Sequence, residues 1–430
     1  MSRPTQLLAA SLSALFTSLL IVLVVVASAG AVAACGGDPD KKLPSEDGVA
    51  AGAAWPMWGF NPARTRVGPD VGLPDGRTPT DALWSKSEMV EQFGDLLEYP
   101  PSIADGRAFY CTNGGGKGGS VIAVSLADGK ELWRYRLSGG GQFASQPAVV
   151  GGIVYVGTMR PHEGRGDPDY EPELLALRAA SDDPGGSVVW RRVIGHAIES
   201  SPLVVGDRLY LCSQNGTLYC YDRLAGARRW ARPLGGKTTS SPAYRDGRVI
   251  VATYGGAVYA FDAASGVRLW RSALRGMFYG TPAIYGRRVI VASLSNGRIY
   301  SLDARNGHTQ WVFPTSQGVY ASPAVWHDAV YIGTKYAGFW CLDVRTGKPK
   351  WPKRKYAGPV YGSATILGGT VYFSTFAAPG KKTGITYGLD ARTGMVRWAF
   401  PDGCYSPVTA TSSIILVTGH HTVYAFRPTP

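Results

Sequence analysis

An acidic segment between residues 159 and 173 carries the side chains best suited to metal chemistry. Four carboxylates alternate within it: Asp167, Asp169, Glu171 and Glu173. Oxygen ligands of this kind suit calcium, which takes about six to eight of them. The spacing makes this segment a weak candidate metal site, and a solvated acidic loop is the simpler interpretation.

Two glycine-rich stretches resemble phosphate-binding loops but lack the surroundings that such loops need. In LGGKTTS (234–240), Ala231 stands where the first glycine of the motif belongs, and strands are expected on both sides instead of a following helix. GGGKGG (114–119) is likewise expected to be a turn between strands. The six histidines are scattered, and none is spaced from a nucleophile as in a catalytic triad. The sequence therefore predicts no catalytic residue.

Five cysteines follow residue 35, and no CxxC or Cys/His spacing among them suggests zinc. They are Cys111, Cys212, Cys220, Cys341 and Cys404. The first four occupy positions of a repeat, described below, where other copies hold small residues, whereas Cys404 lies in a loop. A small buried hydrophobe explains such positions, so we expect free thiols there, although an exported protein can form disulfides.

The first 35 residues have the pattern of an export signal. Residues 7–34 are almost wholly apolar and uncharged, and Arg3 precedes them. The run ends in VAACGG (32–37), which resembles a bacterial lipobox with Cys35 as the lipidated residue. An uncleaved anchor helix is the alternative, because the run is long enough to span a bilayer. Both interpretations place the chain on the extracytoplasmic side of the cell membrane, held there by a flexible tether at 36–54.

Composition favours an all-β chain with a basic surface. The 430 residues include 56 glycines, 23 tyrosines and 12 tryptophans, so turns and aromatic strand formers are plentiful. The formal charge is +13, but the basic residues are scattered, and no nucleic-acid motif accompanies them. We therefore expect no nucleic-acid partner.

One motif recurs along the chain: a small residue, then x-Asp-x-x-x-Gly-x-x-x-Trp. It is found in AFDAASGVRLW (260–270), SLDARNGHTQW (301–311) and GLDARTGMVRW (388–398), among other copies. The tryptophans at 190, 230, 270, 311, 351 and 398 lie 40, 40, 41, 40 and 47 residues apart. A period of about 40 residues with four short strands is the mark of a propeller blade.

The sequence predicts an eight-bladed β-propeller of four-stranded antiparallel blades over residues 81–428, preceded by a segment at 55–80. Eight inner strands can be placed, but the last unit (406–426) lacks its fourth strand and its tryptophan. The early strand DALWSKS (81–87) is spare, so we expect it to complete the last blade. The indoles expected to wedge neighbouring blades are Trp84, Trp133, Trp190, Trp230, Trp270, Trp311, Trp351 and Trp398.

These repeats resemble the pyrroloquinoline-quinone-type (PQQ-like) propeller family, and the chain is most similar to its BamB-like lipoprotein branch. Arg392-Thr393-Gly394 and Arg345-Thr346-Gly347 match the docking motif of the family, and WPMWGFNPARTR (55–66) resembles the segment before its first blade. The resemblance implies a noncatalytic, membrane-anchored scaffold without a cofactor. The alternative within the family is a quinone-dependent dehydrogenase, which binds the quinone with calcium. Many such enzymes carry a vicinal cysteine pair that this sequence lacks.

Propeller geometry brings two kinds of loop to one face: those joining the second and third strands, and those joining successive blades. Candidate binding residues in these loops are Phe143, Phe278, Tyr279, Tyr320, Tyr361, Tyr405, Lys381 and Lys382. Aromatic rings with basic neighbours suit an envelope protein or peptide partner. Binding of carbohydrate or a cell-wall polymer is an alternative, as is a purely structural plug for the channel. We expect a monomeric propeller.

Overall fold

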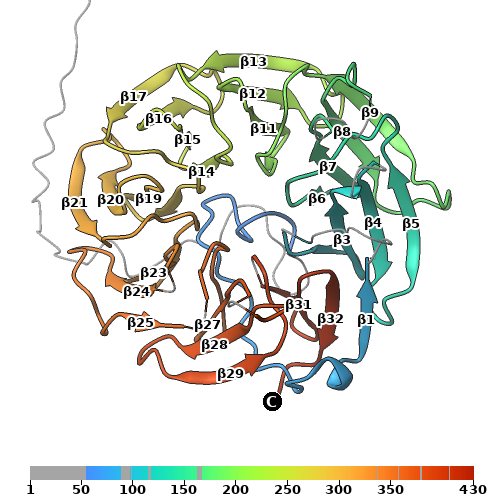
Figure 1. Ribbon diagram of the computed structural model, residues 1–430. Helices are drawn as coiled ribbons and strands as arrows, with labels where there is room; N and C mark the ends of the chain where they lie inside the picture. Colours follow the sequence, from blue (N-terminus) through green and yellow to red (C-terminus); the bar gives the residue numbers. More distant parts are fainter. Residues whose placement is uncertain are drawn as a thin grey trace, which may run out of the picture. The chain divides into compact units, whose positions relative to one another are not determined.

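Eight four-stranded antiparallel sheets form a ring of blades around a central axis (Figure 1). The computed structural model describes residues 55–88, 97, 99–114, 118–161, 167–336, 338–356, 358–377, 380–405 and 407–430. The predicted eight-bladed, all-β fold is confirmed. Cys35 and the expected tether lie outside the described residues. Within those residues, no helix is long and apolar enough to cross a membrane.

Each blade runs outward from a short inner strand beside the axis. Blades one to four comprise β2 (Ser102–Ala104), β3 (Arg107–Thr112), β4 (Ser120–Ser125), β5 (Glu131–Arg136); β6 (Ala148–Val150), β7 (Ile153–Gly157), β8 (Glu173–Arg178), β9 (Val188–Val193); β10 (Leu203–Val205), β11 (Arg208–Ser213), β12 (Thr217–Asp222), β13 (Arg228–Pro233); β14 (Ala243–Arg245), β15 (Arg248–Ala252), β16 (Ala257–Asp262) and β17 (Arg268–Ala273). Blades five to seven comprise β18 (Ala283–Tyr285), β19 (Arg288–Ala292), β20 (Arg298–Asp303), β21 (Thr309–Pro314); β22 (Ala324–Trp326), β23 (Ala329–Gly333), β24 (Gly338–Asp343), β25 (Arg354–Lys355); β26 (Thr365–Leu367), β27 (Thr370–Ser374), β28 (Thr386–Asp390) and β29 (Val396–Phe400).

The eighth blade combines both ends of the propeller. It contains β30 (Val408–Ala410), β31 (Ile415–Thr418), β32 (Thr422–Phe426) and, as its outer strand, β1 (Trp84–Ser87), which follows the 3-10 helix η1 (Pro79–Asp81). Strand β1 pairs antiparallel with β32, with Trp84 opposite Ala425 and Ser87 opposite Thr422. The ring is thus closed by strand pairing, which leaves β32 no open edge.

The recurring motif docks each blade on the next. In blade four, Asp262 Oδ1 accepts a hydrogen bond from the Ser265 amide at 2.8 Å, which shapes the turn that carries Gly266. The Trp230 ring of blade three covers Gly266, and its Nε1 donates to the Ala264 carbonyl at 3.1 Å. The motif therefore supplies both the flat surface and the acceptor that hold an indole between blades.

Every indole predicted to act as a wedge donates to a carbonyl across a blade boundary. The bonds are Trp84 to Leu126 (3.0 Å), Trp133 to Ala179 (3.0 Å), Trp190 to Arg223 (3.1 Å), Trp230 to Ala264 (3.1 Å), Trp270 to Ala304 (3.0 Å), Trp311 to Val344 (2.9 Å), Trp351 to Ala391 (3.4 Å) and Trp398 to Gly76 (2.7 Å). Blade eight has no motif turn of its own between its third and fourth strands, because the fourth strand comes from the N-terminal part of the chain. Gly76 of that part supplies the carbonyl that Trp398 of blade seven binds.

Two glycines of blade four allow the docking contact to be tested separately from backbone strain. Gly266 and Gly247 have φ values of +68° and +74°, so alanine is strained at both. A Cβ at Gly266 would lie 2.7 Å from the Trp230 ring, whereas one at Gly247 would meet nothing within 4 Å. We expect Gly266→Ala to lower the free energy of unfolding by about 2 kcal/mol more than Gly247→Ala, measured by urea denaturation. Equal losses of unfolding free energy in the two variants would mean that the Trp230 indole moves aside without a measurable cost.

Candidate functional site

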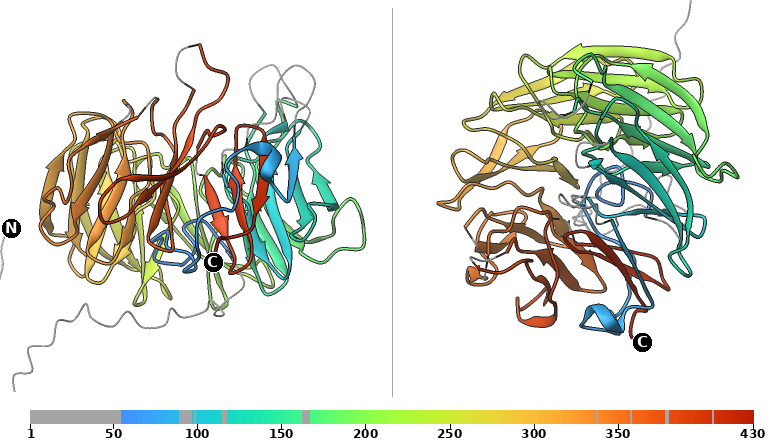
Figure 2. Two further views of the ribbon diagram at one scale, coloured as in Figure 1. Left: turned by 90° about the horizontal axis from the view of Figure 1, so that it is seen from below. Right: turned by 45° about the vertical axis from the view of Figure 1, so that its right-hand side comes forward.

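The segment preceding the first blade runs inside the ring and blocks its centre (Figures 1 and 2). Trp55 pairs with Ile103 of blade one through two backbone hydrogen bonds of 2.8 Å. Further along the segment, carbonyls accept hydrogen bonds from the inner strands of five other blades. The donor and acceptor pairs are Val149 to Pro56, Tyr244 to Pro62, Ile284 to Ala63, Val325 to Thr65 and Ile366 to Arg66. The channel is therefore a blind cavity at this level.

Two buried arginines secure the segment. Arg64 donates to the carbonyls of Pro242 at 2.9 Å and Pro202 at 3.2 Å, which ties it to blades three and four. Arg66 donates to the Ala364 carbonyl at 2.5 Å, and its guanidinium lies 4.1 Å from the centroid of the Trp58 ring. Burial lowers the pKa of each arginine to about 9, so both remain charged at neutral pH.

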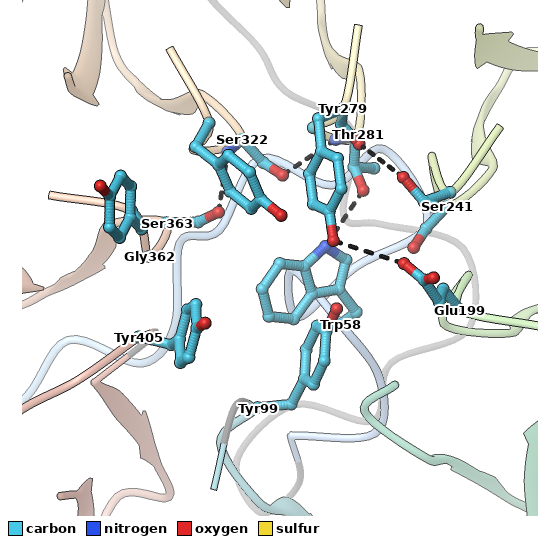
Figure 3. Close-up of a pocket in the computed structure, with 14 residues that line it drawn as sticks. Trp58, Tyr99, Glu199, Ser241, Tyr279, Thr281, Ser322, Gly362, Ser363 and Tyr405 are labelled. Carbon is cyan, nitrogen blue, oxygen red and sulfur yellow. Dashed lines mark hydrogen bonds between the residues drawn. The ribbon is translucent and has the colours of Figure 1, made fainter. Parts of the chain in front are cut away.

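A cavity of about 140 Å³ opens from Trp58 toward one face of the ring (Figure 3). The loops around it establish which face this is. Tyr254, between β15 and β16, stacks on Tyr279, between β17 and β18, at 6.0 Å, and Phe376 packs against Tyr405 at 4.7 Å. The two kinds of loop predicted to share a face therefore do so, and we call this side the mouth face.

Hydroxyl side chains from successive blades line the cavity and link the blades. Four of them lie two residues before the first strand of their blades, namely Ser241, Thr281, Ser322 and Ser363, and Thr239 lines the cavity as well. Ser241 Oγ accepts the Ser201 amide at 2.9 Å, and Ser322 Oγ accepts the Thr281 amide at 2.9 Å. The Trp58 Nε1 donates to Thr281 Oγ1 at 3.2 Å. The wall of the cavity is thus fixed by repeated contacts between blades.

Four of the eight predicted binding residues meet in this cavity, and four do not. Tyr279, Tyr320, Tyr361 and Tyr405 all line it. Phe143 and Phe278 are wrong as members of a binding face, because they are 3% and 0% exposed and pack into the hydrophobic core. Phe278 directly precedes Tyr279 but turns the other way, against Tyr300 at 5.8 Å. Lys381 and Lys382 are exposed in the loop between β27 and β28 on the mouth face and do not line the cavity.

Glu199 lines the cavity as well and is not among the residues predicted from the sequence. Its Oε1 accepts a hydrogen bond from Gln214 Nε2, and its Oε2 accepts one from the Tyr279 hydroxyl at 3.3 Å (Figure 3). Desolvation raises the pKa of Glu199, and these two hydrogen bonds oppose the shift. A signal was present: Glu199 stands three residues before Pro202, as Tyr279 stands before Pro282. The tyrosine positions of the repeat therefore include one carboxylate.

The other candidate side chains form no second site. Asp167, Asp169 and Glu171 are exposed, and Glu173 lies 3.8 Å from Arg191. Among the described residues, no three His, Cys, Asp or Glu side chains are grouped so that they could hold a metal ion. Cys111, Cys212, Cys220 and Cys341 are free thiols, and burial raises the pKa of Cys220 to about 11, which makes it unreactive.

The cavity offers aromatic rings, hydroxyl groups and one carboxylate. Its described lining holds six aromatic rings and one carboxylate, with no lysine, arginine or histidine. A quinone that carries several carboxylates needs cationic partners, and its calcium needs several oxygen ligands. The residues present do not provide either set. What they can do is hold an aromatic, sugar or cationic group against tyrosine faces.

The fold and this cavity define an eight-bladed propeller of the PQQ-like repeat class with a blind, aromatic central site. A family model described as "Outer membrane protein assembly factor BamB" matches residues 76–170 and 176–400, more than half of the sequence. The chain belongs to this family.

The individual relatives include both an assembly factor and a dehydrogenase. The outer membrane protein assembly factor BamB of Salmonella typhimurium is 30% identical over 127 residues, which cover 27% of this chain and 27% of that protein. The quinohemoprotein alcohol dehydrogenase ADH IIB of Pseudomonas putida is 28% identical over 125 residues, covering 25% of this chain and 18% of that enzyme. The matches thus span about a quarter or less of these relatives' own lengths.

Solved structures show the same division. BamB from Moraxella catarrhalis superposes with a TM-score of 0.57 at 18% identity, covering 80% of this chain and 96% of that one. The quinohemoprotein alcohol dehydrogenase from Comamonas testosteroni gives a TM-score of 0.64 at 15% identity, covering 87% and 80%. At such identities the likeness establishes the fold alone, so the function has to be argued from the site.

Proposed function

We propose that this protein is a noncatalytic scaffold of the cell envelope that binds a protein or peptide partner through the mouth face. The observation that carries the proposal is the cavity itself, where tyrosines from successive blades gather over Trp58 and no group of described His, Cys, Asp or Glu side chains could hold a metal ion. Clustered tyrosines with a desolvated centre are typical of energetically dominant contact points in protein interfaces. The N-terminal 35 residues would anchor the scaffold through a lipid on Cys35 or through an uncleaved helix.

The first test removes two neighbouring rings. Tyr320 and Tyr361 are half-buried and lie 5.7 Å apart, edge to face. Tyr320→Ala combined with Tyr361→Ala should reduce capture of crosslinked envelope partners at least about tenfold, since interface tyrosines can each contribute more than about 1 kcal/mol. The melting temperature should fall by only a few degrees, because the rings lie at the surface of the channel.

The matched control changes two exposed side chains on the opposite face. Leu224 and Met395 are 58% and 61% exposed in the turns between β12 and β13 and between β28 and β29. Leu224→Ala combined with Met395→Ala should leave partner capture unchanged. A large loss of stability in the tyrosine variant, with normal capture by the fraction that remains folded, would show instead that the rings merely plug the channel.

Two further functions are distinguishable from the scaffold. Tyrosine faces beside hydroxyl groups also suit sugars, so binding of purified wall polymer in place of envelope proteins would favour a carbohydrate receptor. Titration with the quinone and calcium, followed by absorbance, tests the dehydrogenase alternative. A bound quinone spectrum at stoichiometric ratio would contradict the proposed function directly.

A further inference from the structure

An unbroken series of aromatic contacts runs along the cavity, and four of its five rings line it. Tyr279 and Tyr320 have ring centroids 3.9 Å apart, Tyr320 and Tyr361 are 5.7 Å apart, and Tyr361 lies 4.7 Å from Phe376. Tyr405 continues the series from Phe376 at 4.7 Å. These rings come from loops of blades four to eight, so together they form a curved aromatic wall, and where a ring turns its face to the cavity it presents electron-rich surface.

One carboxylate stands at the open end of this wall. Glu199, from the loop before blade three, is bonded to the Tyr279 hydroxyl and therefore touches the first ring of the series. It is the one acidic group among the described lining residues. No basic side chain compensates its charge there, since its hydrogen-bond partners are an amide and a phenol. Glu199 is thus a desolvated carboxylate without a counter-ion in the described lining.

The charge of this lining contrasts with the rest of the chain. The protein has 44 lysines and arginines against 31 acidic residues, yet none of the basic residues lines the cavity in the described part of the chain. Two buried cations lie near the base of the cavity, and both are held by backbone carbonyls: Arg66 lies over the Trp58 ring, and Arg64 donates to the Ser201 and Pro202 carbonyls of the loop that carries Glu199. Neither forms an ion pair with Glu199 among the described residues. Next to blade three, the loop of blade two adds the exposed Asp167, Asp169 and Glu171 to the mouth face.

We propose that the cavity binds one positively charged side chain, the ammonium or guanidinium group of a partner polypeptide, with Glu199 as its counter-ion. This inference rests on the proposed function, because it names what the partner inserts into the mouth face. A cation over tyrosine rings gains from the ring quadrupoles, and more so when it is desolvated. The bond to Glu199 is charge-assisted and fixes the position of the cation. The volume also fits, since a cavity of about 150 Å³ accommodates a group as large as benzene.

The sharpest test replaces Glu199 by its uncharged isostere. In E199Q the new amide oxygen can still accept a hydrogen bond from Gln214, and the new NH2 group can donate to the Tyr279 hydroxyl oxygen, so both contacts can be kept with the second bond reversed. Calorimetric titration with a blocked glycine–lysine–glycine tripeptide, and with its arginine counterpart, should show binding that E199Q weakens at least about tenfold. The same tripeptide with an acetylated lysine should bind the wild-type protein as weakly, because acetylation removes the charge.

A second variant controls for the general charge of the mouth face. Glu171 is exposed and lies outside the cavity, so E171Q removes an equal charge from the same face. E171Q should change the affinity for the lysine tripeptide less than about twofold at physiological salt, since exposed charges are screened. The inference is overturned if E171Q and E199Q weaken binding equally, if the acetylated tripeptide binds as well as the charged one, if a glutamate tripeptide binds better, or if neither cationic tripeptide binds at millimolar concentration.

Stability offers an independent readout of the same substitution. Because the pKa of Glu199 is raised in the folded state, the folded protein binds this proton more tightly than the unfolded chain does. Stability therefore falls as pH rises from the ordinary glutamate pKa through the raised one. The titratable groups coupled to Glu199 are Tyr254 and Tyr279, whose pKa values are themselves raised, that of Tyr254 to about 12, so both stay neutral there. E199Q should thus melt no lower than the wild type at pH 7, and a marked loss of stability would mean a structural role instead.

The outcomes separate this inference from the proposed function. If the double tyrosine variant loses its envelope partner while E199Q captures it normally, the scaffold function is supported and the cation site is contradicted. If E199Q abolishes tripeptide binding while E199Q and the double tyrosine variant both capture the envelope partner normally, the cation site is supported and the scaffold function is contradicted.

Discussion

Replacing Trp84 by alanine should lower the free energy of unfolding by about 3–5 kcal/mol, the range seen when a buried tryptophan is truncated. Trp84 is 9% exposed, its Nε1 bonds to the Leu126 carbonyl, and its ring lies so close to Gly129 that a Cβ there would be 2.6 Å away. It is the docking indole of the blade that joins the two ends of the propeller. The substitution therefore leaves a cavity at the closure of the ring.

A matched variant separates closure from docking in general. Trp230 is 7% exposed and makes an equivalent 3.1 Å bond to Ala264, but the chain runs continuously from blade three to blade four. We expect Trp230→Ala to cost a similar free energy while leaving the ring closed. Only Trp84→Ala should release β1 and expose the edge of β32, seen as faster amide exchange at residues 422–426 and as concentration-dependent aggregation. Equal exchange at β32 in both variants would show that closure does not depend on the indole.

The blades could be predicted because their determinants are local and repeated. Asp262, Gly266 and Trp270 lie within nine residues of one another, and the same spacing recurs, so each copy supports the assignment of the others. The closing strand was predictable by counting strands. The last blade lacked a fourth strand, and the strand that carries Trp84 had no blade of its own. Strand length was less predictable: Trp351 docks as expected but precedes the short β25 instead of lying in it.

The site was predictable only in part, because its arrangement arises from ring closure. Tyr279 and Phe278 are neighbours in an irregular loop, where no alternation of side chains says which one faces the channel. The partnership of Glu199 with Tyr279 spans 80 residues and two inter-blade loops. The path of residues 55–66 through the channel depends on backbone hydrogen bonds with six different blades and on bonds from Arg64 to a seventh, none of which is signalled locally.

That path rests on Arg64, and its removal is the second large effect we expect. Arg64 adopts a positive φ of 59° and spreads its guanidinium over carbonyls from two blades and from Trp58 of its own segment. Taking one charge into the centre of the ring is costly, as its lowered pKa indicates. The cost is tolerated because a planar guanidinium donates hydrogen bonds to several buried carbonyls at once. Each of these carbonyls would otherwise be buried without a partner, which destabilises the folded state by about 1–3 kcal/mol.

Arg64→Ala should therefore lower the free energy of unfolding by about 3–5 kcal/mol, even though it relieves the buried charge. Arg64→Lys tests the reason, because it keeps the charge and loses the planar fork; we expect it to cost nearly as much. Arg268→Ala, at an exposed position of β17, serves as the surface control and should stay within about 0.5 kcal/mol of the wild type. Urea denaturation of the three variants measures the differences. If Arg64→Lys were as stable as the wild type, charge rather than hydrogen-bond geometry would hold the segment in the channel, and the blind cavity above Trp58 would have to be explained by electrostatics alone.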